Sequence, residues 1–140
     1  MTPPKVIFIS VKDNHAKVQA ILRIAHHYFS QGIRLLFSVA SDETARYLDE
    51  LLWKSPPESF LPHAILSQPA LEPIAITTSE KNVNQAPILF NLCPEANHLA
   101  QSCKVTYEYF DETHASKLEQ SIKRKEIYTL QGLECVSSIN

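Results

Sequence analysis

Short apolar runs rich in β-branched residues alternate with a segment of helical periodicity in the first third of this chain. Residues 5–11 are typical of a strand buried on both faces, and residues 34–40 repeat that pattern. Between them, apolar residues recur at helical spacing as far as Ser30, and Gly32 follows where a left-handed helix cap would sit. Because a helix between two buried strands forms a crossover, this order predicts a mostly parallel sheet.

The rest of the chain continues the alternation. Ser41, followed by Asp42 and Glu43, supplies an N-cap and favourable charges for a helix that ends near Trp53. Further strands are predicted at 74–77, 88–92 and 104–110, with a short helix at 94–101 and a longer one at 111–129. The apolar residues expected to bury part of this last helix are Ala115, Leu118, Ile122 and Ile127. We therefore expect an α/β fold, a single-domain Rossmann-like arrangement of three layers over residues 1–140.

Composition excludes several classes of protein. The net charge is −2 at pH 7, whereas proteins that grip duplex phosphates usually carry a strong basic excess, so tight direct DNA binding is not expected. Three widely spaced cysteines argue against a disulfide scaffold or a zinc ribbon. The N-terminus enters a strand with no signal-peptide pattern, and no apolar run approaches the roughly 20 residues of a membrane span. The expectation is a soluble, cytoplasmic protein.

Glycine content bears on the ligands that a Rossmann-like fold often binds. Gly32 and Gly132 are the only glycines, so neither G-x-G-x-x-G nor a Walker loop can occur, and no phosphate cradle is predicted. The histidines have no partners at metal-ligand spacing, and Cys93 near His98 is a weak nucleophile pair. We expect no cofactor, no metal and no catalysis. The alternative left open is a small Rossmann-like enzyme acting on a nucleotide or acyl substrate.

The most unusual segment is residues 48–63, which hold Trp53, Phe60 and several prolines beside a helix end. One interpretation is that the two aromatics are core anchors that pin an irregular loop. The other is that they are interface residues, because aromatics on a rigid loop lose little entropy on binding. For Trp53 the two interpretations carry similar weight, whereas Phe60, flanked by prolines, favours exposure.

This segment resembles the chi subunit of bacterial DNA polymerase III, whose members share a pattern close to L-D-E-x-L-W-x-x-P-x-E-S-F-x-P-H. Every position of that pattern is filled, with Trp53, Pro56, Glu58, Ser59, Phe60, Pro62 and His63 in place. The similarity extends over nearly the whole chain, in the order of the N-terminal strand, Gly32, Asp42-Glu43, Tyr128 and Gly132.

The resemblance implies a non-catalytic accessory subunit of the clamp-loader assembly, which bridges a psi-like subunit or a repair helicase to the single-stranded-DNA-binding protein. Trp53, Phe60 and Pro62 would face psi or the helicase. The acidic tail of the single-stranded-DNA-binding protein, which ends in a Phe and a free carboxylate, would meet the C-terminal helix at Lys123, Arg124, Lys125 and Tyr128. An alignment on Gly132 instead puts Ile122, Lys125 and Glu126 at the tail-contact positions, and both registers remain open.

Overall fold

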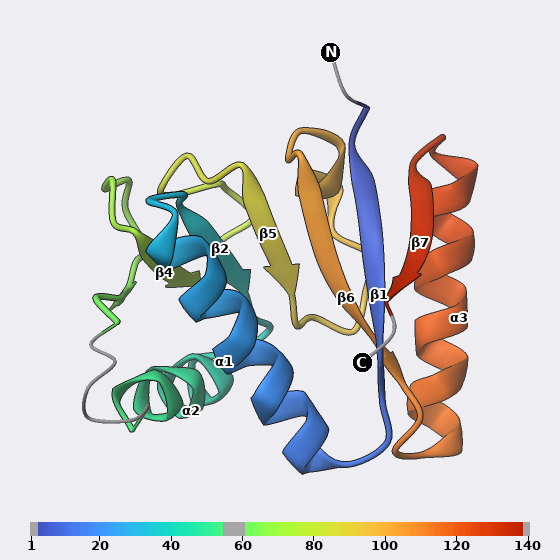
Figure 1. The fold of residues 1–140 in the computed structure, drawn as a ribbon. Coiled ribbons are helices and arrows are strands. Elements are labelled where there is room, and N and C mark those ends of the chain that lie inside the picture. The colour runs from blue at the N-terminus through green and yellow to red at the C-terminus, as the bar shows by residue number, and fades with distance from the viewer. Residues whose placement is uncertain (1–2, 55–60, 139–140) are drawn as a thin grey trace.

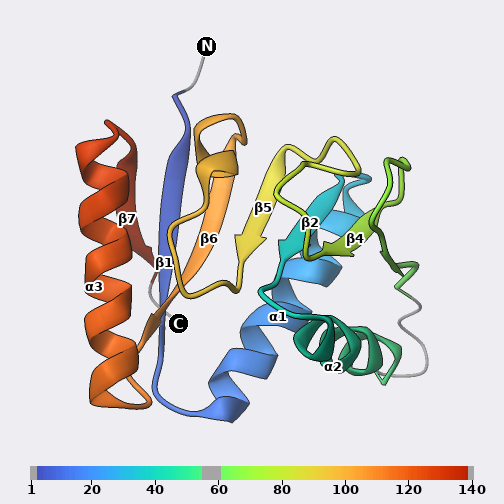
Figure 2. The ribbon, with the colours of Figure 1, turned by 180° about the vertical axis from the view of Figure 1, so that it is seen from behind.

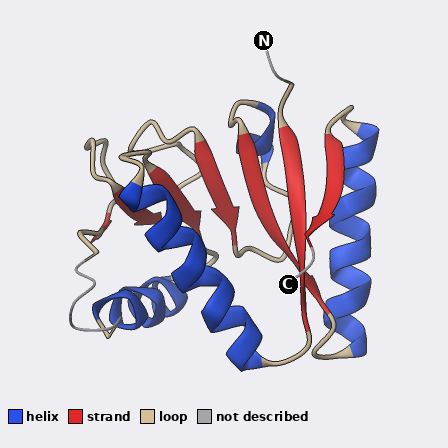
Figure 3. Cartoon of the chain, in the orientation of Figure 1, coloured by secondary structure: helices blue, strands red, loops and turns tan. Residues whose placement is uncertain are grey.

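The computed structural model describes residues 3–54 and 61–138, in which seven strands form one sheet in the order β3-β4-β2-β5-β6-β1-β7 (Figures 1 and 3). Every pairing between these described strands is parallel. The strands are β1 (Lys5–Val11), β2 (Leu35–Ser38), β3 (Ala64–Ile65), β4 (Ile74–Thr77), β5 (Ile88–Asn91), β6 (Val105–Asp111) and β7 (Glu134–Ser138). The helices are α1 (Asn14–Ser30), α2 (Asp42–Trp53), the 3-10 helix η1 (His98–Gln101) and α3 (Ala115–Leu130). None of the described helices is both long and apolar enough to span a membrane.

The two faces of the sheet are covered by different helices. Ile9 and Val11 of β1 pack in the core cluster that contains buried residues of α1 and α2, such as Ile21 and Leu48. Successive side chains of a strand point to opposite faces, so Phe8 lies on the other side, in a cluster with Tyr128 of α3. Figure 1 shows α1 and α2 on the near face, and Figure 2 shows α3 and η1 on the opposite face. The expected three-layer Rossmann-like arrangement is confirmed.

Local sequence accounts for where the helices begin and end. The Asp13 carboxylate accepts a hydrogen bond from the Ala16 amide at 2.8 Å, which caps α1. The Thr44 amide donates to Ser41 Oγ at 3.2 Å and caps α2 in the same way. Gly32 has a φ of 69°, a left-handed conformation that glycine adopts without strain, so α1 stops there and the chain turns into β2.

The structure differs from the sequence expectation at three elements. β3 and β7 were not expected: β3 is only two residues long, and β7 is a half-buried edge strand of mixed sequence, Glu-Cys-Val-Ser-Ser. The predicted helix at 94–101 is reduced to η1, which begins only after Asn97, whose side chain caps it by accepting from the Leu99 amide. Both new strands lie at the edges of the sheet, where burial imposes less of a pattern on the sequence.

The buried face of α3 also differs from the prediction. Ile122 and Ile127 of the expected apolar stripe are exposed, and the residues turned into the protein are Ser121, Arg124 and Tyr128. The stripe was wrong because the interior beneath this helix is partly polar: Glu108 of β6 is buried there beside Phe8, so α3 turns hydrogen-bonding side chains inward. This polar interior determines which side chains α3 presents to solvent.

Candidate functional site

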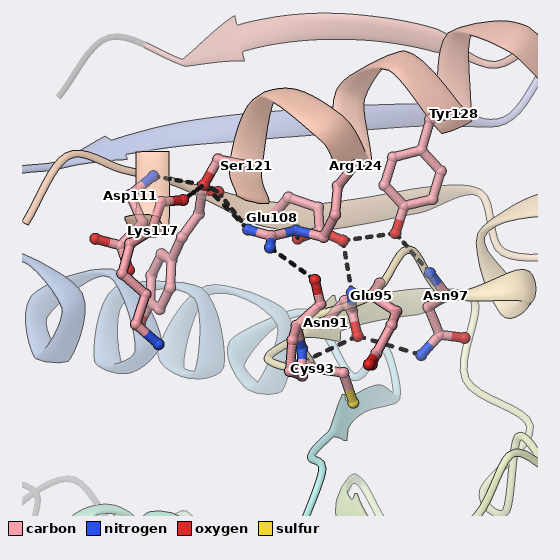
Figure 4. Close-up of polar contacts among 12 residues, drawn as sticks. Asn91, Cys93, Glu95, Asn97, Glu108, Asp111, Lys117, Ser121, Arg124 and Tyr128 are labelled. Atoms are coloured by element: carbon pink, nitrogen blue, oxygen red, sulfur yellow. Dashed lines mark hydrogen bonds and ion pairs between the residues drawn. The ribbon is translucent and has the colours of Figure 1, made fainter. Parts of the chain in front are cut away.

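The inner face of α3 is held by a buried ion pair (Figure 4). Arg124 is 7 % exposed, and its Nε donates to Glu108 Oε1 of β6 at 2.9 Å. The remaining guanidinium nitrogens donate to the carbonyl oxygens of Pro94 at 3.0 Å and Tyr109 at 3.2 Å. One side chain therefore ties α3 to β6 and to the turn after β5.

Glu108 is the acceptor at the centre of this network. Tyr128, which is fully buried, donates to Glu108 Oε2 at 2.5 Å, and Asn91 Nδ2 donates to the same oxygen at 2.6 Å. The Tyr128 hydroxyl also accepts from the Asn97 amide at 2.9 Å. Burial raises the pKa of the Glu108 carboxyl to about 7, while Arg124 and the hydrogen bonds from Tyr128, Asn91 and Arg124 favour its ionised form.

The four residues predicted for tail binding do not form one surface. Arg124 and Tyr128, one helical turn apart, both point into the Glu108 network. Lys123 is exposed and lies 3.9 Å from Glu119 on its own helix. Lys125 is partly exposed, and because two residues on a helix are separated by roughly 200°, it lies nearly opposite Lys123. The predicted grouping is corrected accordingly: of the four, Lys125 alone lines a groove on the outer side of α3.

That outer groove combines a base with apolar side chains. The α3 groove, as we call it, is shallow and lined by Ile122, Lys125, Glu126, Thr129 and Leu130. Leu130 is 87 % exposed, and Ile122 is also exposed. An apolar strip beside an ammonium group is suited to a peptide that carries both an apolar side chain and a carboxylate. The alignment on Gly132 points to these same positions, since it selects Ile122, Lys125 and Glu126.

The second surface lies at the end of α2. Trp53 is 55 % exposed, so it is not a core anchor, and its ring packs on that of His63 with centroids 4.6 Å apart. The His63 side chain is itself fully buried, with Nδ1 2.7 Å from the Leu61 carbonyl and Nε2 3.1 Å from Asp49 Oδ1. A buried imidazole held on both edges thus gives the exposed indole a rigid support.

The chain that leads away from this surface is anchored by Leu61, which is buried in the core cluster under α1 and α2. Pro62 is partly exposed beside it. Phe60 lies outside the described residues. The structure thus brings Trp53 and the Pro62–His63 segment together at one end of the sheet, while α3 lies at the other (Figure 1).

The described residues offer little for catalysis or metal binding. No group of three or more His, Cys, Asp or Glu side chains within 3–54 and 61–138 is placed to hold a metal ion. Cys93 and His98 line the same hollow at the end of β2. Burial raises the pKa of the Cys93 thiol above its ordinary value, which opposes the thiolate that a nucleophilic cysteine requires.

Sequence reasoning missed Glu108, the residue on which the placement of α3 depends. A signal was present: Glu108 stands between Tyr107 and Tyr109 in the interior of a predicted strand, where an unpaired carboxylate is costly. Such a residue requires buried donors from a neighbouring element, and Arg124 lies on the helix that follows this strand. Pairing the two would have predicted that Arg124 points inward.

The fold and these surfaces define a doubly wound α/β protein that exposes an indole at one end of its sheet and an apolar groove with a lysine at the other. The chain belongs to the family described as DNA polymerase III chi subunit, HolC, whose model matches residues 3–135. It is 30% identical over 96 residues to the DNA polymerase III subunit chi of Pseudomonas aeruginosa, covering 69% of this chain and 68% of that protein. With the subunit of the same name from Haemophilus influenzae it shares 26% identity over 112 residues, covering 78% and 77% of the two chains.

Proposed function

We propose that this protein is a non-catalytic subunit of the clamp-loader assembly of DNA polymerase III, which bridges a psi-like subunit or a repair helicase to the C-terminal tail of the single-stranded-DNA-binding protein. The observation that carries the proposal is the family match, which spans residues 3–135. A bridge needs two binding surfaces that do not overlap. The surface at Trp53 and the α3 groove, at opposite ends of the sheet, are suited to this requirement.

The alternative, a small enzyme acting on a nucleotide or acyl substrate, has less support. A cysteine enzyme would depend on an activated thiolate, whereas burial raises the pKa of the Cys93 thiol. A nucleotide enzyme of this fold would depend on a glycine-rich turn after β1, where the sequence reads Lys12-Asp13-Asn14. The two functions differ in their ligands, so a thermal-shift comparison of nucleotides with an acidic C-terminal peptide separates them.

The α3 groove is the proposed site for the acidic tail. Lys125 would attract the carboxylates of the tail, and Ile122 with Leu130 would receive its aromatic side chain. Arg124 and Tyr128 contribute indirectly, since they hold the helix that carries the groove. A short peptide that orders on docking is expected to bind with a dissociation constant on the order of micromolar.

Reversal of charge at Lys125 tests this assignment. Lys125→Glu is expected to lower the affinity for a fluorescently labelled tail peptide by roughly 10- to 100-fold, because an attraction between residue 125 and the acidic tail becomes a repulsion. Glu126→Gln, in the same groove, is expected to strengthen binding, since it removes an acid that opposes the tail. Fluorescence anisotropy at two salt concentrations measures both effects, and wild-type affinity is expected to fall as salt rises.

The matched control is Lys123→Glu, which changes the net charge by the same amount at a residue that does not line the groove and lies roughly 200° around the helix from Lys125. The affinity of this variant for the tail is expected to lie within about twofold of the wild-type affinity, because salt largely screens an exposed charge that does not contact the tail. Equal losses for Lys123→Glu and Lys125→Glu would mean that net charge alone governs binding. Undiminished binding by Lys125→Glu would remove the α3 groove from the site.

A further inference from the structure

A cavity of about 500 Å³ opens between α1, α2 and α3, on the side of α3 away from the α3 groove. Its lining residues come from the helices that follow β1 and β2, from the segment after β5, from the end of β6 and from α3. They include Lys17 of α1, Tyr47 of α2, Asp111 of β6 and Lys117 of α3. The volume falls within the range of roughly 300–1,000 Å³ that is typical of small-molecule sites.

The position of this cavity is the one where doubly wound sheets bind ligands. β1 and β6 are parallel neighbours, with Val11 opposite Asp111 at their carboxyl ends. The helix that follows β1 packs on one face of the sheet, and the helix that follows β6 packs on the other. The two connections therefore diverge at this point and leave a crevice, which is the topological switch point of the fold.

One of the cationic side chains that line the cavity has no anionic partner among the described residues. Lys17 Nζ is paired with Asp111 Oδ2 at 2.7 Å, and Arg124 is paired with Glu108. Lys117 is exposed at the rim, and no described carboxylate lies within 4.0 Å of its ammonium group. A ligand that neutralises this surplus carries a single negative charge.

The opposite wall is apolar. Val18 and Ile21 of α1, Leu48 of α2 and Leu92 after β5 line it. Tyr47, at 58 % exposure, stands at the entrance, and the Tyr109 hydroxyl is fixed by donation to the Lys17 carbonyl at 2.7 Å. A wall of this kind is suited to a flat apolar body and not to a hydrated polyphosphate.

From this arrangement we infer that the cavity is a binding site for a small organic monoanion, an apolar or aromatic body with one carboxylate that Lys117 receives. Lys17 and Asp111, paired with each other at 2.7 Å, line the polar side of the cavity and leave Lys117 as the cation available to the ligand. The site is separate from the α3 groove and from the Trp53 surface. The inference therefore does not depend on the proposed bridging function.

The test is a titration of the full chain with 2-naphthoate, followed by two-dimensional NMR of the backbone amides. Saturable binding is expected with a dissociation constant on the order of a millimolar or tighter, as for a ligand of this size. The shifted amides are expected to cluster at Lys17, Tyr47 and Lys117. The neutral isostere 2-naphthamide is expected to bind at least about fivefold more weakly, because it lacks the charge that Lys117 neutralises.

Two variants on one helix complete the design. Lys117→Gln is expected to lower the affinity for 2-naphthoate by at least about fivefold. Lys123→Gln, which changes an exposed residue outside the cavity, is expected to leave that affinity unchanged. Equal binding of the acid and the amide, shifts confined to other surfaces, or the same loss in both variants would overturn the inference. Tighter binding of ADP than of 2-naphthoate would overturn the assignment of a monoanion.

Discussion

Arg124→Ala is expected to lower the free energy of unfolding by about 3 to 5 kcal/mol, the loss typical of breaking a buried ion pair. The substitution leaves Glu108 buried without its cation and removes the donors to the Pro94 and Tyr109 carbonyl oxygens. Urea unfolding at pH 7, followed by circular dichroism, measures the loss as a shift of the midpoint with little change in slope.

Two controls separate the pair from a general effect of charge. Lys123→Ala removes an exposed base from the same helix and is expected to change stability by no more than about 0.5 kcal/mol. The double variant Arg124→Met with Glu108→Gln is expected to recover part of the loss, because glutamine still accepts from Tyr128 and no unpaired charge remains buried. A loss for Arg124→Ala no larger than for Lys123→Ala would contradict the buried network.

Trp53→Ala is expected to weaken the binding of a psi-like subunit or helicase by about 2 kcal/mol or more, a loss of affinity of roughly 30-fold, because interface tryptophans are frequent hot spots. The isolated variant is expected to keep a melting temperature close to that of wild type, since the indole is more than half exposed. Tyr47→Ala is the matched control, as this residue is similarly exposed on the same helix. Isothermal calorimetry with the purified partner measures the affinity of each variant.

Phe60→Ala is expected to have an effect of similar size at the same interface, and Pro62 a smaller one. Unchanged partner affinity in both Trp53→Ala and Phe60→Ala would remove this surface from the bridge. A large fall in the melting temperature of Trp53→Ala would instead indicate that the indole stabilises the fold, which its exposure does not suggest.

Most of the sheet could be predicted from sequence because its central strands are buried on both faces. β1, β4 and β5 are continuous apolar runs, and such runs are recognisable without any knowledge of their neighbours. The edge strands β3 and β7 escaped detection because one side of an edge strand is free of partners, so its sequence is under weaker constraint. The start of helix α2 was predicted correctly, because Ser41 and the acids after it mark an N-cap.

The candidate surfaces were harder to predict than the fold. The exposed position of Trp53 depends on the buried His63 beneath it, a contact between residues ten positions apart that no local pattern encodes. On α3, the apolar stripe was misleading because a buried glutamate on β6 draws Arg124 and Tyr128 inward. The cavity at the switch point is assembled from separate segments of the chain, so its charge balance emerges only in three dimensions.

The proposed bridge requires one chain to bind two partners at once, and co-sedimentation detects such a complex. The single-stranded-DNA-binding protein and the clamp loader, both from the same organism, are mixed with and without this protein. The two are expected to sediment together only when this protein is present, and removal of the C-terminal tail of the single-stranded-DNA-binding protein is expected to abolish the effect. Equal co-sedimentation without this protein, or with the tail removed, would mean that this chain does not bridge the two.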